Sequence, residues 1–232
     1  MYKNKIDNIL TGLFVMIIFL CVALITKDVI NYKKADKEYN RLKKYISYPT
    51  ESFNADNSEN SDFNPEDADG KDMENPEKGY DYERLYEINH DLVGILSIPS
   101  LDLMYPVVQS SDNIKYLNTT FEGNKNPAGC LFIDYENSRD LSDPNTYVYG
   151  HNMKDGSMFG SLKKIIKDKQ DEKDTKAYMQ TGTDRYTYSL EKAEVVNIYE
   201  YKPHKTTEDL LTLYTCWGND KSKRLLVTFL RD

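Results

Sequence analysis

A run of seventeen uncharged, mostly apolar residues, Ile9–Ile25, lies close to the N-terminus. As a helix rising about 1.5 Å per residue, this run would extend roughly 25 Å, slightly short of the hydrocarbon thickness of a typical membrane. Lys3 and Lys5 precede it and no small-residue cleavage site follows, which favours an uncleaved signal anchor over a removed signal peptide. The alternative is a buried core helix, but a small domain seldom contains a helix that is apolar on all sides. We therefore expect residues 1–27 to be a single-pass membrane anchor, embedded through residues 9–25.

Residues 28–49 continue the helical pattern, with apolar and aromatic residues recurring three and four positions apart. These recurring residues are Val29, Tyr32, Ala35, Tyr39, Leu42 and Ile46. Because the stripe is narrow and most other positions are charged, we interpret this segment as a membrane-proximal helix that Pro49 ends.

Residues 50–79 are rich in Asn, Asp, Glu, Ser, Pro and Gly. Residues 51–79 hold ten carboxylates and two lysines, a balance of −8 that equals the net charge of the whole chain. Such a composition cannot bury enough apolar surface to fold, so it predicts an acidic disordered linker. The rest of the chain is neutral in sum, which argues against nucleic-acid binding.

Residues 80–232 are long enough to form one hydrophobic core, and their pattern is mainly β. Eight short runs are expected to be strands: Val93–Ile98, Leu103–Gln109, Gly129–Asp134, Thr146–Tyr149, Arg185–Leu190, Glu194–Tyr201, Leu210–Cys216 and Arg224–Leu230. Helices are expected at Tyr82–His90 and Ser157–Lys167. Many short strands with few helices indicate a closed or nearly closed barrel.

Two of these strand ends carry residues with reactive side chains. Gly150 and His151 follow one strand, and Cys216 ends another. The seven-residue loop 217–223 then leads to Arg224, and a loop of this length between adjacent strands would bring Arg224 close to Cys216. A thiolate is a nucleophile that a nearby cation favours, an imidazole can protonate a leaving amine, and a guanidinium can stabilise an oxyanion.

Each of these residues also has a simpler interpretation. Cys216 could be a small buried hydrophobe, His151 a surface turn residue and Arg224 a solvated loop end. Cys130 lies among apolar neighbours and is expected in the core. Three cysteines and three histidines without close spacing predict neither a disulfide framework nor a metal site, and we expect no cofactor.

The segment Thr212–Cys216, followed by Arg224, resembles the signature of the sortase family, Thr-Leu-x-Thr-Cys and then Arg. Tyr149–Met153 and Gly156–Phe159 are similar to the histidine motif of class B sortases. Other segments similar to that class are Val93–Pro99, Tyr105–Gln109, Asp112–Leu117 and Ala128–Asp134. The resemblance covers residues 80–232 and implies an eight-stranded sortase-type β-barrel with a few short helices.

The same resemblance implies a cysteine transpeptidase. In that family Cys216 would be the nucleophile, His151 would protonate the departing amine, and Arg224 would stabilise the bound substrate and the oxyanion. Neighbouring residues are expected to bind substrate: Thr215, Tyr214 and Asn152. The substrate would be a secreted protein with a C-terminal sorting signal, cleaved after Thr. An amine of a peptidoglycan precursor or of a pilin would then resolve the acyl-enzyme, as in the anchoring of Gram-positive surface proteins.

Two expectations depend on comparing this chain with that class. Its members usually carry a helix-containing insertion before the cysteine strand, whereas here the connection is only Tyr201–Asp209. Sortases work outside the cell, so we expect the catalytic domain to be extracellular. The charge count alone indicates the opposite orientation, because seven lysines and arginines lie between residues 27 and 44.

Two other functions stay open from the residues themselves. One is a purely hydrolytic Cys–His protease, and the other is an anchored, non-enzymatic binding domain in which Cys216 is inert.

Overall fold

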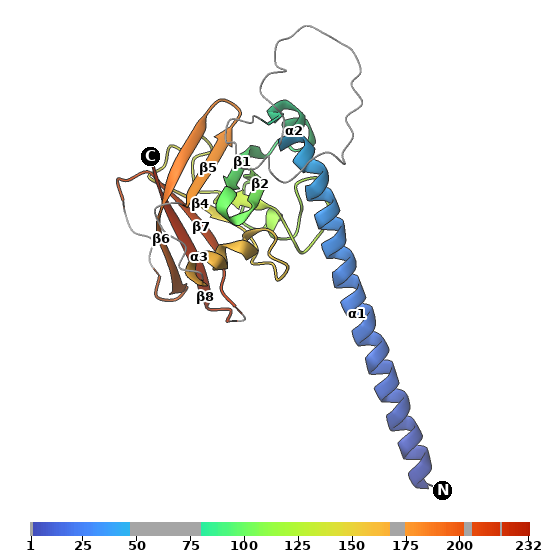
Figure 1. The fold of residues 1–232 in the computed structure, drawn as a ribbon. Coiled ribbons are helices and arrows are strands. Elements are labelled where there is room, and N and C mark those ends of the chain that lie inside the picture. Colours follow the sequence, from blue (N-terminus) through green and yellow to red (C-terminus); the bar gives the residue numbers. More distant parts are fainter. Residues whose placement is uncertain (1, 47–79, 168–174, 202–205, 219) are drawn as a thin grey trace, which may run out of the picture.

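The computed structural model describes residues 2–46, 80–167, 175–201, 206–218 and 220–232, and the predicted acidic linker lies outside them. Within these residues, eight strands close into a barrel in the order β1-β2-β3-β4-β7-β8-β6-β5 (Figure 1). The strands are β1 Leu92–Ile98, β2 Leu103–Val108, β3 Leu131–Ile133, β4 Asn145–Tyr149, β5 Lys176–Thr181, β6 Arg185–Asn197, β7 Leu210–Cys216 and β8 Lys223–Arg231. The predicted mainly β, eight-stranded barrel is therefore confirmed.

The helices of the described residues are few and, with one exception, short. They are α1 Tyr2–Ile46, α2 Tyr82–Ile88, α3 Lys163–Lys167 and the 3-10 turns η4 Pro99–Leu101, η5 Lys115–Leu117 and η6 Phe159–Leu162. The predicted helix Ser157–Lys167 is thus shorter and divided between η6 and α3. It cannot begin at Ser157 because Met158 adopts a φ of 50°, outside the right-handed helical region.

The predicted and observed numbers of strands are both eight because two errors in the prediction cancel. The predicted strands Arg185–Leu190 and Glu194–Tyr201 are one long strand, β6, which pairs with β8 across a register shift between Leu190 and Lys192. Strand β5 was not predicted. Lys, Gln and Thr make up half of its six residues, and Ala177 and Met179 are the residues that it buries.

The register of three central strands positions the candidate site. Strand β4 is parallel to β7, with Tyr149 opposite Tyr214 in the last pair. Strand β7 is antiparallel to β8, with Cys216 opposite Arg224. Because successive side chains in a strand point to opposite faces, Tyr214 and Cys216 share the outer face while buried Thr215 points inward.

Helix α1 has two different parts. Over its N-terminal part it projects away from the barrel (Figure 1), and the described large apolar side chains from Leu10 to Leu24 are exposed. In the described part of the chain, α1 is the one helix whose length and composition suffice to cross a membrane. Its C-terminal part packs on the domain, where Ala35, Leu42 and Ile46 are buried in the hydrophobic core.

A buried carboxylate adds polar contacts to this packing. Glu38 is 4% exposed and accepts hydrogen bonds from the Thr120 hydroxyl (2.9 Å), the Glu122 backbone N–H (3.0 Å) and the Asn124 side-chain amide (3.0 Å). Asn126 donates from its side chain to the Asn31 carbonyl of α1 (2.8 Å). The predicted membrane-proximal helix is therefore an integral part of the packed domain, which begins well before the predicted boundary at residue 80.

The two described ends that flank residues 47–79 lie side by side. The Asp81 backbone N–H donates to the Tyr45 carbonyl (2.8 Å), and both Ile46 and Tyr80 belong to the core. The acidic segment thus connects two neighbouring parts of one domain. The predicted disorder of residues 50–79 falls outside the described residues and stays a prediction.

Candidate active site

The chain after β4 lies alongside the end of β7 because hydrogen bonds continue past the last strand pair. The Gly150 backbone N–H donates to the Tyr214 carbonyl (3.2 Å), and the Thr215 hydroxyl donates to the Gly150 carbonyl (2.7 Å). The Asn152 side-chain amide then donates to the Cys216 carbonyl (2.8 Å). The segment that contains His151 therefore runs alongside the end of β7 that carries Cys216.

Arg224 joins this end from the other side of β7, as the partner of Cys216 in the β7–β8 pairing. Its Nη1 donates to the carbonyls of Lys221 (2.8 Å) and Lys223 (2.9 Å), which direct the guanidinium. Among the described residues, no carboxylate forms an ion pair with Arg224. Within the described residues its positive charge thus has no carboxylate partner, and its backbone lies opposite that of Cys216.

Gly150 lies between β4 and His151, close to two apolar side chains. A Cβ atom on this residue would lie 2.4 Å from a side-chain carbon of Leu131 and 2.7 Å from one of Phe159. The loop that starts at His151 closes on itself, because the Phe159 backbone N–H donates to the His151 carbonyl (2.9 Å). A larger residue at this position of the histidine motif would therefore require the side chains of Leu131 and Phe159 to move.

The imidazole of His151 has a defined partner. Its Nε2 lies 2.7 Å from the carbonyl oxygen of Leu117. A carbonyl can only accept, so Nε2 carries a proton and donates to Leu117, while Nδ1 is left for proton exchange. Leu117 was not among the predicted site residues, although it ends the segment Asp112–Leu117, which resembles class B sortases.

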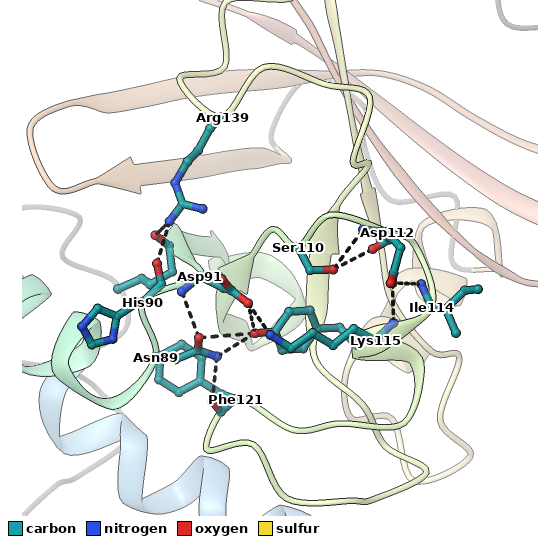
Figure 2. Close-up of polar contacts among 11 residues, drawn as sticks. Asn89, His90, Asp91, Ser110, Asp112, Ile114, Lys115, Phe121 and Arg139 are labelled. Atoms are coloured by element: carbon teal, nitrogen blue, oxygen red, sulfur yellow. Dashed lines mark hydrogen bonds and ion pairs between the residues drawn. The ribbon is translucent and has the colours of Figure 1, made fainter.

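The segment that carries Leu117 is tied to the turn before β1 by polar contacts (Figure 2). Lys115 forms an ion pair with Asp91 (2.5 Å), to which the Tyr116 hydroxyl also donates (2.7 Å). The Asn89 side-chain amide donates to the Phe121 carbonyl (2.8 Å). Burial opposes ionisation of Asp91, but its bonds to Lys115 and Tyr116 outweigh this effect and lower the pKa of its carboxyl group. The Leu117 carbonyl thus belongs to a firmly held segment.

The three cysteines have very different surroundings. Cys216 is exposed at the end of β7. Cys130 is buried, and this burial raises the pKa of its thiol to about 12, so its thiolate is scarce at neutral pH. Cys21 lies in the apolar part of α1. Of the three, Cys216 is the thiol whose position and neighbours suit a nucleophile.

Two packed tyrosine rings lie on the outer face of the barrel next to Cys216. The ring of Tyr214 packs edge-on against Tyr149, with centroids 5.1 Å apart, and the Arg224 guanidinium lies 5.9 Å from the Tyr214 ring. The Tyr149 hydroxyl donates to the Asp134 carboxylate (2.6 Å). Burial raises the pKa of Tyr214, so its hydroxyl stays neutral at physiological pH.

The residues expected to bind substrate divide into two kinds. Tyr214 is half-buried on the outer face, where a substrate can reach it. The polar groups of Thr215 and Asn152 are engaged with the backbone of Gly150 and Cys216, so their visible contacts serve to hold the site together. Substrate binding by all three stays a prediction.

Comparison with known proteins places this geometry in a family. The model of the sortase domain matches residues 96–230, which is 135 of the 232 residues. Sortase B of Listeria monocytogenes is 46% identical over 82 residues, which are 35% of this chain and 33% of that protein. Sortase B of Staphylococcus aureus is 37% identical over 86 residues, 37% of this chain and 35% of that protein. The matched segments thus span about a third of the length of these curated relatives.

Solved structures extend the similarity over the barrel. The crystal structure of sortase B from Bacillus anthracis superimposes with a TM-score of 0.56 and 28% identity, covering 66% of this chain and 84% of that one. Because the sortase domain model matches more than half of the chain and these relatives are class B enzymes, we conclude that this protein belongs to the sortase family and is similar to its class B members.

Proposed function

We propose that this protein is a membrane-anchored cysteine transpeptidase that cleaves a C-terminal sorting signal after Thr. It then joins the new carbonyl to an amine of a peptidoglycan precursor or of a pilin. The observation that carries the proposal is the arrangement at one barrel end: an exposed thiol, Cys216, between the segment of His151 and the unpaired cation Arg224. Membership of the sortase family supports it.

In the first half-reaction, the Cys216 thiolate attacks the carbonyl carbon of the scissile peptide bond. The carbonyl oxygen becomes an oxyanion, which the Arg224 guanidinium would stabilise by directed hydrogen bonds. As the carbon–nitrogen bond breaks, His151 gives a proton to the departing amine, and a thioester between Cys216 and the substrate remains.

In the second half-reaction, the acceptor amine attacks the thioester carbonyl. His151 takes the proton that this amine loses, the carbon–sulfur bond breaks, and the Cys216 thiolate is regenerated. The hydrogen bond from Nε2 to the Leu117 carbonyl keeps the ring oriented through both steps. The hydrolytic alternative differs only in the attacking group, which would be water.

The anchoring and orientation belong to the same proposal. The exposed apolar part of α1 supports a single membrane crossing. The catalytic domain would lie on the outer side of the cell membrane, as the resemblance to sortases implies. Because the C-terminal part of α1 packs on the barrel, the domain would sit close to the membrane surface. That position suits enzymes whose substrates and acceptors are themselves held at the membrane.

Incubation of the full-length protein in detergent with peptides that contain a cleavable Thr–x bond tests the activity. We expect a thioester adduct on Cys216, seen by mass spectrometry, and a ligated product when a primary amine is added. Cys216→Ala should abolish both, while Cys130→Ala, a matched control on a buried thiol, should keep the chemistry.

Three results would contradict the proposal in different ways. Hydrolysis that an added amine never diverts would identify a Cys–His protease. No reaction of Cys216 with peptides or thiol probes would favour an anchored binding domain. An adduct on Cys130 would mean that the nucleophile is misassigned.

A further inference from the structure

Tyr39 of helix α1 contacts the surroundings of His151 although the two residues lie far apart in the sequence. Tyr39 is 7% exposed and faces the barrel in the middle of the packed part of α1. Two separate sets of contacts lead from its side chain to the histidine, one through its hydroxyl and one through its ring.

The hydroxyl contacts reach the partner of the imidazole. The Tyr39 hydroxyl donates to the Gly129 carbonyl (2.6 Å). Gly129 has a φ of +61° and packs so tightly that a Cβ atom would lie 2.4 Å from the Tyr116 carbonyl oxygen and 2.9 Å from that of Leu117. This Leu117 oxygen accepts the hydrogen bond from His151. A shift of Gly129 would therefore displace the acceptor that orients the ring.

The ring contacts reach the loop that follows His151. The ring of Tyr39 packs edge-on against Tyr105, with centroids 5.3 Å apart. The Tyr105 hydroxyl accepts a hydrogen bond from the Met158 backbone N–H (3.2 Å). Met158 holds a φ of 50°, which is costly for a residue with a side chain and persists only where the surroundings enforce it. Phe159, next in the chain, closes the loop on the His151 carbonyl.

We propose that Tyr39 is a positioning residue for His151, so that the helix leading from the membrane anchor helps to orient the catalytic imidazole. Tyr39 does not contact the reacting atoms and acts through Gly129 and Tyr105. The proposal rests on the function given above, because it assigns His151 the role of proton donor and acceptor.

The test compares single hydroxyl deletions in the full-length protein. Tyr39→Phe keeps the ring and removes the bond to Gly129, and Tyr105→Phe removes the acceptor of Met158. We expect each to lower kcat about fivefold, the typical net effect of one hydrogen bond, and to leave KM within about twofold. Tyr32→Phe, on the same helix but 40% exposed, is the matched control and should change neither constant.

A second readout does not depend on turnover. In protein with ¹⁵N-labelled histidine, the imidazole signals of His151 should shift in Tyr39→Phe and Tyr105→Phe and stay unchanged in Tyr32→Phe. Unchanged kcat and unchanged His151 signals in Tyr39→Phe would overturn the proposal, even if its melting temperature falls, because the contact would then be merely structural. If the wild type itself shows no transpeptidation, the proposed function fails, and the imidazole signals still decide whether Tyr39 positions the ring.

Discussion

Cutting the chain inside residues 50–79 should leave the catalytic domain attached to the membrane. If the acidic segment were a tether, one cut would release the domain. In the structure, α1 is packed on the barrel before the segment begins, and the chain after it returns to α1 through the bond between Asp81 and Tyr45. The two fragments should therefore stay together without a covalent connection.

Truncating Leu42 shows how strongly the packing of α1 should hold the two fragments together. Its side chain is 1% exposed and lies among the core residues. Replacing a buried leucine with alanine costs about 2–5 kcal/mol, which would weaken the association of the two fragments about 30- to 5,000-fold. Val29→Ala on the same helix is the matched control, because Val29 is 45% exposed and its truncation should change the association little.

The assay uses the full chain in lipid vesicles. A recognition sequence for a specific protease is inserted at one position within residues 60–66. After cleavage, the vesicles are sedimented under native conditions and both fractions are run on a denaturing gel. We expect the wild type and Val29→Ala to show two fragments, both in the pellet. Leu42→Ala should lose its catalytic fragment to the supernatant after cleavage and keep it in the pellet before cleavage.

Release of the wild-type catalytic fragment by cleavage alone would refute this reasoning. It would mean that the contacts of α1 with the barrel are too weak to hold the domain, and that the acidic segment is the tether that the composition suggested.

Three further predictions concern the site. Iodoacetamide should modify Cys216 in the folded protein and spare Cys130, whose raised pKa lowers its thiolate fraction roughly a thousandfold at neutral pH. Peptide mapping by mass spectrometry measures the extent of modification of each thiol, and equal modification of both would contradict the prediction. Arg224→Lys should lower kcat/KM about 10²–10³-fold, nearly as much as Arg224→Ala, because lysine loses the planar donors. A lysine variant within threefold of the wild type would leave Arg224 as a background charge. Thr215→Val should cost about 1–3 kcal/mol in urea unfolding, since it removes the donor to the Gly150 carbonyl, and an unchanged unfolding free energy would show that this bond contributes nothing.

Residue patterns were sufficient for the barrel where strands bury alternate or continuous apolar residues, as in β7 and β8. They failed at β5, where only Ala177 and Met179 mark the buried face, and across β6, where the register shift after Leu190 interrupts the alternation. In the stripe on residues 28–49, the later residues Ala35, Tyr39, Leu42 and Ile46 are buried as expected, whereas Val29 and Tyr32 are exposed. Nothing in that stripe identified its partner, because apolar contacts are not directional and many surfaces could cover it.

The sequence by itself determined that this chain has an apolar N-terminal helix and a mainly β domain, and that a histidine, a cysteine and an arginine lie at strand ends. These are local properties, set by hydrophobic periodicity and turn residues. Only the tertiary structure showed that the Leu117 carbonyl orients His151 and that the Tyr39 hydroxyl reaches Gly129, 90 residues away. The acceptors in both contacts are backbone carbonyls, which every residue carries, so the side-chain pattern does not reveal which of them the fold brings to a given donor.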